Sequence, residues 1–184
     1  MRRALLFVAL SLAAGCGAGI ESGRELGLFT PSAIGTRAEE EHAVRATLDA
    51  WHEAAARSDE AAYFELMTRD AVFLGTDATE RWTREQLRAY AHEPFSQGRG
   101  WRMRAVRRDV VIADGPIHDG SMAWFDEDLE TVNLGPARGS GVLVRDGLGW
   151  RIAQYNLTIT VPNERFGEVR ALLSAPLTAQ DPAQ

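Results

Sequence analysis

Residues 118–162 read HDGSMAWFDEDLETVNLGPARGSGVLVRDGLGWRIAQYNLTITVP, and this stretch decides the fold. It holds three β-rich segments separated by two glycine-containing turns, NLGPA at 133–137 and DGLG at 146–149. Connections this short favour antiparallel neighbours. We therefore expect three adjacent strands, with the preceding parts of the chain covering the sheet that they form.

Successive side chains of a strand point to opposite faces of a sheet. In the last segment this alternation predicts one face with Trp150, Ile152, Gln154 and Asn156, and another with Arg151, Ala153, Tyr155, Leu157 and Ile159. In the first segment, Trp124, Asp126 and Asp128 share a face. Because neither face is simply polar, we expect the chain's own helices to cover one face and a second subunit to cover the other.

The N-terminus has the pattern of a secretion signal. Met1-Arg2-Arg3 is basic, residues 4–14 form an apolar run too short to span a bilayer, and small residues lead to Cys16. The stretch resembles a bacterial lipobox, and Cys16 is the one cysteine of the chain. We expect a signal peptide at 1–15, a lipidated Cys16 and a flexible tether at 16–36. The domain would then be lipid-anchored in the bacterial cell envelope; without lipidation it would be secreted or periplasmic.

Composition excludes several classes of function. The formal charge of the chain is −6, and removing Arg2 and Arg3 with the signal peptide gives −6 − 2 = −8. Such an acidic body argues against a nucleic-acid partner. All 20 basic residues are arginine, which excludes lysine chemistry. The four histidines are scattered and no cofactor fingerprint is present, so we expect neither a metal nor a cofactor.

The remaining segments predict helices and two further strands. Helical periodicity begins at Arg37 and continues for about 20 residues, Ser58 precedes a short helix, and Thr83 with Gln86 forms a capping box. Strands are expected at 71–74 and 101–113, and a helix at 163–174 with Phe166, Val169, Leu172 and Leu173 facing inward. Residues 175–184 are expected to form a loose tail. Helices on one face of an antiparallel sheet make an α+β domain.

This layout, together with GTDATERW (75–82), AWFDED (123–128), RGSGVL (138–143) and WRIAQYNLTI (150–159), resembles the SnoaL-like branch of the nuclear transport factor 2-like superfamily. The resemblance implies one domain at 37–174: a cone in which a curved antiparallel sheet wraps around a long N-terminal helix, with two to three further helices. It also implies an apolar pocket at one end of the cone and homodimers formed through the outer face of the sheet.

The resemblance also implies which residues belong to the pocket. The aromatic candidates are Tyr63, Trp82, Trp101 and Trp124, and the polar candidates are His52, Asp77, Glu80, Asp126, Arg138, Gln154 and Asn156. The residues themselves leave structural roles open. His52 could be a packing residue, Asp77 could cap a turn, and Asp126 with Arg138 could be an ion pair that fixes strand register.

Three functions are compatible with this sequence. The first is a non-catalytic domain that binds a small, largely apolar molecule. The second is a cofactor-independent isomerase, dehydratase or hydrolase with Asp77, Glu80 or Asp126 as general base and Arg138 or His52 stabilising charge. The third is a dimeric interaction scaffold. A deep carboxylate with a raised pKa would favour the enzyme, and carboxylates held in ion pairs would favour the binding domain.

Overall fold

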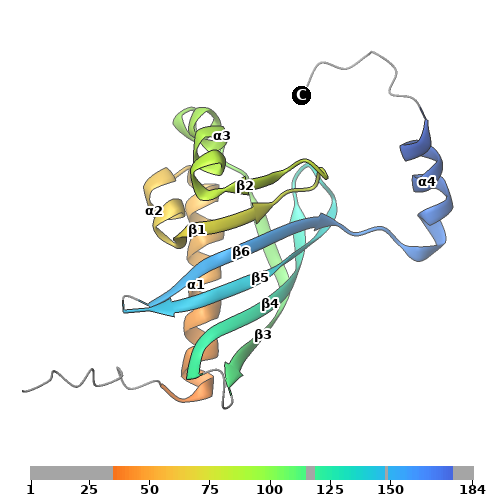
Figure 1. The fold of residues 1–184 in the computed structure, drawn as a ribbon. Coiled ribbons are helices and arrows are strands. Elements are labelled where there is room, and N and C mark those ends of the chain that lie inside the picture. Colours follow the sequence, from red (N-terminus) through yellow and green to blue (C-terminus); the bar gives the residue numbers. More distant parts are fainter. Residues whose placement is uncertain (1–34, 115–118, 148, 176–184) are drawn as a thin grey trace, which may run out of the picture. The chain divides into compact units, whose positions relative to one another are not determined.

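The computed structural model describes residues 35–114, 119–147 and 149–175 of the 184-residue chain. The predicted signal peptide, Cys16, nearly all of the tether, His118 and residues 176–184 of the predicted tail lie outside the described residues. Within them, four α-helices and six strands form an α+β domain (Figure 1). The sequence predicted this class, the four helices and five of the strands, but not the short strand at Arg81–Thr83.

Three helices precede or interrupt the strands. Helix α1 (Arg37–Ala56) begins with a capping box in which Thr36 and Glu39 satisfy each other's backbone N–H groups. Helix α2 (Glu60–Glu65) is short and is capped by the side chain of Asp59. Helix α3 (Arg84–Ser96) begins with the capping box of Thr83 and Gln86 that its sequence predicts. The polar residues that cap the N-termini of these three helices therefore lie next to each helix in the sequence.

The six strands are β1 (Met67–Leu74), β2 (Arg81–Thr83), β3 (Met103–Asp114), β4 (Asp119–Thr131), β5 (Pro136–Asp146) and β6 (Gly149–Ile159). They form one sheet in the order β2-β1-β6-β5-β4-β3. Strands β3 to β6 pair antiparallel, as their short turns require, but β1 and β6 run parallel. The sheet is therefore mixed, whereas the sequence predicted an antiparallel one, because the pairing of β1 with β6 depends on no turn.

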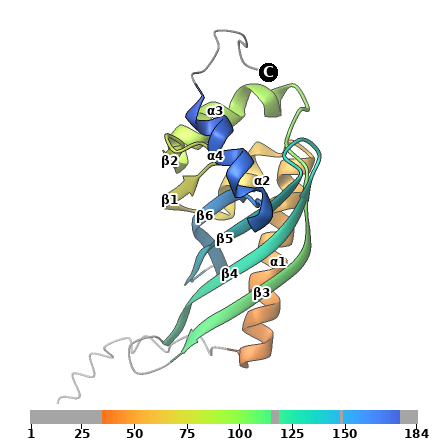
Figure 2. The ribbon, with the colours of Figure 1, turned by 90° about the vertical axis from the view of Figure 1, so that its right-hand side faces the viewer.

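Helix α1 packs across one face of the sheet, and Figure 2 shows strands β3–β6 bending around it. Its buried side chains Val44, Leu48, Trp51 and Ala55 recur at helical spacing and form the core together with the inner face of the sheet. No helix of the described residues is long and apolar enough to cross a membrane.

The alternation predicted for the last strand was wrong, and a β-bulge is the reason. Val142 pairs with Gln154 while Leu143 pairs with Ile152, so Ala153 is an extra residue opposite β5. The extra residue reverses the alternation. Trp150 and Ile152 therefore share the buried face with Tyr155 and Leu157, while Gln154 lies on the exposed face.

The C-terminal helix also differs from its prediction. The 3-10 helix η1 (Asn163–Arg165) leads into α4 (Phe166–Ser174), which has no buried residue. Phe166, Leu172 and Leu173 are 55%, 75% and 82% exposed, so they do not face inward. The apolar spacing correctly indicated a helix, but it gave no information about the surface that the helix covers.

Gly141 allows the backbones of β5 and β6 to approach each other at the bulge. A Cβ atom at Gly141 would lie 2.0 Å from the backbone oxygen of Gln154. We predict that Gly141→Ala lowers the free energy of unfolding by about 1–3 kcal/mol, because the strands must shift apart. Urea denaturation measures this effect. Gly147→Ala is the matched control, since a Cβ there meets nothing within 4 Å and should change stability little; equal effects of the two substitutions would contradict the prediction.

Candidate functional site

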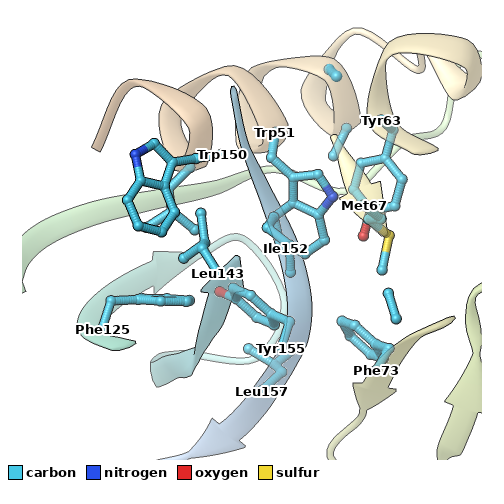
Figure 3. Close-up of a cluster of buried hydrophobic side chains, with 14 of the residues drawn as sticks. Trp51, Tyr63, Met67, Phe73, Phe125, Leu143, Trp150, Ile152, Tyr155 and Leu157 are labelled. Carbon is cyan, nitrogen blue, oxygen red and sulfur yellow. The ribbon is translucent and has the colours of Figure 1, made fainter. Parts of the chain in front are cut away.

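The inner face of the sheet and α1 enclose a connected group of aromatic side chains. Trp51 of α1 stacks on Tyr63 with ring centroids 4.6 Å apart and also contacts Tyr155 of β6 at 4.6 Å. Phe73 of β1 lies parallel to Tyr155 at 5.9 Å. Figure 3 shows these rings between α1 and the sheet, together with Leu143 and Ile152. The interior of the cone beside α1 is thus largely filled by aromatic side chains.

A smaller cavity, of about 200 Å³, remains where this aromatic group ends. Its wall is mainly apolar and consists of Phe73, Trp82, Leu87, Tyr90, Trp101, Met103, Leu134 and Leu157. Polar groups come from Gly75, Thr76, Glu80, Arg102, Thr131 and Asn133. Because these residues come from β1, β2, α3, β3, β4, β6 and the loops beside them, the cavity exists only in the folded domain. Three of the predicted pocket residues, Glu80, Trp82 and Trp101, line it.

The aromatic rings of the cavity are held by their neighbours. Trp82 lies between Phe73 at 6.2 Å and Tyr90 at 4.7 Å. Trp101 contacts Tyr63 edge to face at 5.7 Å, and Tyr63 is itself fully buried. Tyr63 therefore supports the wall from behind, although the prediction placed it among the residues that line or close the pocket.

The loop between β1 and β2 holds two predicted carboxylates. Asp77 accepts hydrogen bonds from the hydroxyl and the backbone N–H of Thr79, and these bonds lower the pKa of Asp77. The Oε2 atom of Glu80 accepts a hydrogen bond from the backbone nitrogen of Asp77 at 3.1 Å. Asp77 thus organises its own turn, which is the structural role that the sequence left open, and only Glu80 of the two reaches the cavity.

A buried polar cluster, the Glu127 centre, borders the aromatic group. The carboxylate of Glu127 in β4 lies in the middle of this cluster. The Glu127 side chain is fully buried, because alternation along β4 directs it inward between Phe125 and Leu129. Three groups hydrogen-bond to its carboxylate: His52 Nε2 at 2.7 Å, the Tyr155 hydroxyl at 2.8 Å and Arg108 Nε at 2.6 Å. The sequence pointed to His52 but not to Glu127, Tyr155 or Arg108. The signal that could have found Glu127 is its position between two apolar residues on the inward-facing side of a strand.

The electrostatics of this centre favour an ionised carboxylate. Burial raises the pKa of Glu127, but the hydrogen bonds and charges of His52 and Arg108 outweigh it, so the pKa lies below its usual value. Burial and the negative charge of Glu127 raise the pKa of Tyr155 well above its usual value. The tyrosine therefore stays protonated and donates, and the ionised carboxylate requires His52 to donate from Nε2.

Arg108 connects this centre to α1. Its Nη1 atom donates to Asp49 at 2.7 Å and to the backbone oxygen of Arg45 at 3.1 Å, and Arg45 donates back to the carbonyl of Arg108 at 2.7 Å. Because His52 also belongs to α1, one carboxylate holds the helix against three strands. The geometry indicates a structural centre that is closed to solvent.

Five predicted pocket residues lie elsewhere. Trp124, Asp126, Arg138, Gln154 and Asn156 are on the outer face of the sheet, away from α1, and none of them lines the cavity of Trp82. Asp126 lies opposite Ser140, so the pair predicted between Asp126 and Arg138 was wrong. Arg138 lies opposite Asp128 and is 3.5 Å from its carboxylate, while Asp126 is 3.5 Å from Arg107. Strand register, which the sequence did not determine, causes this difference.

No group of three or more His, Cys, Asp or Glu side chains in the described part of the chain could hold a metal ion.

The family model of the SnoaL-like domain matches residues 44–162. The chain belongs to this family. The match includes every element from the second turn of α1 to the end of β6, and therefore both the cavity and the Glu127 centre. No protein of curated function matches the chain in sequence.

Solved structures share the fold at low sequence identity. A domain of unknown function with a cystatin-like fold from Nostoc punctiforme is 18% identical, with a TM-score of 0.58 over 77% of this chain and 90% of that one. An NTF2-like protein of unknown function from Pseudomonas putida is 14% identical, with a TM-score of 0.53 over 79% and 97% of the two chains. An uncharacterised protein with a cystatin-like fold from Caulobacter vibrioides is 16% identical, with a TM-score of 0.55 over 73% and 99%. These similarities establish the NTF2-like fold, and they say nothing about the ligand.

The buried carboxylate gives a prediction about stability. Glu127→Gln should lower the free energy of unfolding by about 3–5 kcal/mol at neutral pH, because it leaves the guanidinium of Arg108 without its buried counter-charge. Glu130→Gln removes an exposed partner of Arg104 and serves as the control, with an expected loss below about 1 kcal/mol. Urea denaturation of both variants at neutral pH is the measurement.

The pH dependence of the stability difference between wild type and Glu127→Gln tests whether Glu127 is ionised in the folded chain. The pKa of Glu127 is lower in the folded chain than the ordinary value of 4.5. The contribution of the ionised carboxylate to stability is therefore complete above that value and is lost as the pH falls through the folded pKa. The gap in stability between wild type and Glu127→Gln should therefore narrow below about pH 4.5. Parallel stability curves from neutral to acidic pH would contradict an ionised, stabilising Glu127.

Proposed function

We propose that this domain binds a small, largely apolar molecule in the cavity lined by Trp82 and Trp101, and does not act on it chemically. The observation that supports this most strongly is the composition of the cavity, whose walls are aromatic and aliphatic with a few polar groups. Protein sites for small molecules typically combine an apolar wall with a small number of polar groups that orient the ligand.

The size of the cavity limits the ligand. An apolar cavity of about 150 Å³ is large enough to take up benzene. The cavity here, at about 200 Å³, has room for one ring and a short substituent. Glu80, Arg102 and Asn133 contribute groups that could pair with a polar substituent, while the ring would lie against Trp82 or Trp101.

The carboxylates of the domain give little support to the alternative, an enzyme with a carboxylate base. The lowered pKa of Asp77 makes it a weaker base, and Asp126 lies on the outer face beside Arg107. Glu127 is deep, but its pKa is lowered rather than raised and its donors already surround it. Glu80 is the one acidic residue among the cavity-lining residues, and it accepts from the backbone of its own loop.

Indole is a suitable probe for this site, because it combines an aromatic ring with one polar group. We predict that Trp82→Ala weakens indole binding at least about tenfold, which corresponds to about 1.4 kcal/mol, because one wall of the site is lost. Two-dimensional NMR titration with indole measures the affinity. Trp124→Ala removes a tryptophan from the outer face and should leave the affinity unchanged. Binding that survives Trp82→Ala, or that is lost equally in both variants, would sink the proposal.

The outer face of the sheet supports the expected homodimer. Trp124 is 46% exposed there and lies between Val111 of β3 and Val142 of β5 in the strand register. A row of apolar side chains across three strands is typical of a surface that another protein covers. We propose that two copies associate through this face, and the dimer could also serve as the interaction scaffold that the sequence allows.

We also propose that a lipid on Cys16 anchors the mature protein to the cell envelope. The support is the sequence pattern of residues 1–16 alone. Cys16→Ser should move the protein from the membrane fraction to the soluble envelope fraction, as measured by fractionation and immunoblotting, because one thiol carries the whole attachment. Membrane association that persists in the variant would rule the anchor out.

A further inference from the structure

Helix α4 presents an apolar face that no part of the described chain covers. Phe166, Val169, Leu172 and Leu173 follow the spacing of one helix face, and the side chains of Phe166, Leu172 and Leu173 are mostly exposed. Within the described residues, α4 packs mainly against η1, and no α4 residue is buried.

A helix of this length needs a partner surface. Isolated helices shorter than about 12–15 residues are marginal in water, and α4 has nine residues. The ion pair at its start, between Arg165 of η1 and Glu168, is exposed and contributes little. The stability of α4 must therefore come from burying the face of Phe166 and Leu173 against another apolar surface.

The outer face of the sheet offers such a surface at one end. Val111, Trp124 and Val142 are cross-strand neighbours, and Met122 and Val144 form the next pair along β4 and β5. The other end of this face is charged, with Arg107, Asp126, Asp128 and Arg138 in contact with one another. We define the apolar patch as Val111, Met122, Trp124, Val142 and Val144.

The chain leaves the sheet at the end opposite to this patch. Ile159, the last residue of β6, pairs with Ala137 at the start of β5, and Ala137 is about 17 Å along the strand from Val142. Two copies can meet through their outer faces about a two-fold axis that lies between the sheets and perpendicular to the strands. The strands of the two copies then run in opposite directions, so the end of β6 in one copy faces the apolar patch of the other. In that arrangement α4 of each copy extends toward the patch of its partner.

We propose that α4 is exchanged between two copies of the chain, with its Phe166–Leu173 face seated on the partner's apolar patch. The proposal rests on the homodimer proposed above and specifies what builds its interface. Each of the two contacts would bury roughly 400 Å² on the helix and a similar area on the sheet. The total, about 1,600 Å², is the size of a stable protein–protein interface.

Sedimentation velocity of the mature chain distinguishes the exchange of α4 from a dimer that the outer sheet faces form without α4. Leu172→Asp with Leu173→Asp should convert the dimer to a monomer, and so should Trp124→Asp. Glu168→Gln, on the polar side of the same helix, should leave the dimer intact and is the control. If Trp124→Asp gives a monomer while the double leucine variant stays dimeric, the sheet face makes the dimer without α4, and the exchange is wrong. A monomeric wild-type chain would overturn both the dimer and the exchange.

Crosslinking between differently labelled chains tests the exchange directly. In a Cys16→Ser background, one chain carries Leu173→Cys and the other Val142→Cys, and the mixture is treated with a short bis-maleimide. Crosslinked heterodimers should form only when α4 reaches the partner's sheet. A crosslink found solely within one chain, in the double variant with both cysteines, would place α4 on its own sheet and contradict the proposal.

Discussion

The fold depends on one buried carboxylate. Glu127 is fully enclosed and binds His52 of α1, Arg108 of β3 and Tyr155 of β6. An enclosed carboxylate is tolerated only when charged and hydrogen-bonded partners compensate for its lost hydration. These partners come from elements far apart in the chain, so the requirement fixes how α1 lies on the sheet. Apolar contacts alone would allow more than one arrangement, because they have little directional preference.

The filled interior limits the proposed ligand site to the cavity of Trp82. Trp51, Tyr63 and Tyr155 occupy the volume beside α1, and Glu127 holds Tyr155 in place through its hydroxyl. Phe73 connects the two regions, since its ring stacks on Tyr155 and also lines the cavity of Trp82. The aromatic wall of the cavity is thus held in place, through Phe73 and Tyr155, by the ionic Glu127 centre. Such support favours a preformed site, in which little binding free energy is lost to ordering side chains.

Local signals predicted much of the fold and less of the site. The capping box of Thr83 and Gln86, the helical spacing after Arg37 and the glycine turns gave the elements correctly, because each depends on residues near in sequence. The face of Gln154 depended on a bulge at Ala153, and the partner of Arg138 depended on register. Neither is encoded by alternation alone. Trp82 and Trp101 were found through the family resemblance, whereas Glu127 was missed because a buried charge runs against the usual pattern of apolar cores.

Native mass spectrometry of the purified mature protein, compared with its mass under denaturing conditions, tests most directly whether the aromatic cavity is a ligand site. We predict a bound species of small mass, on the scale of one substituted ring, that is absent when Trp82 is replaced by alanine. A native mass equal to that of the polypeptide alone, unchanged after incubation with excess indole and other single-ring compounds, would contradict it.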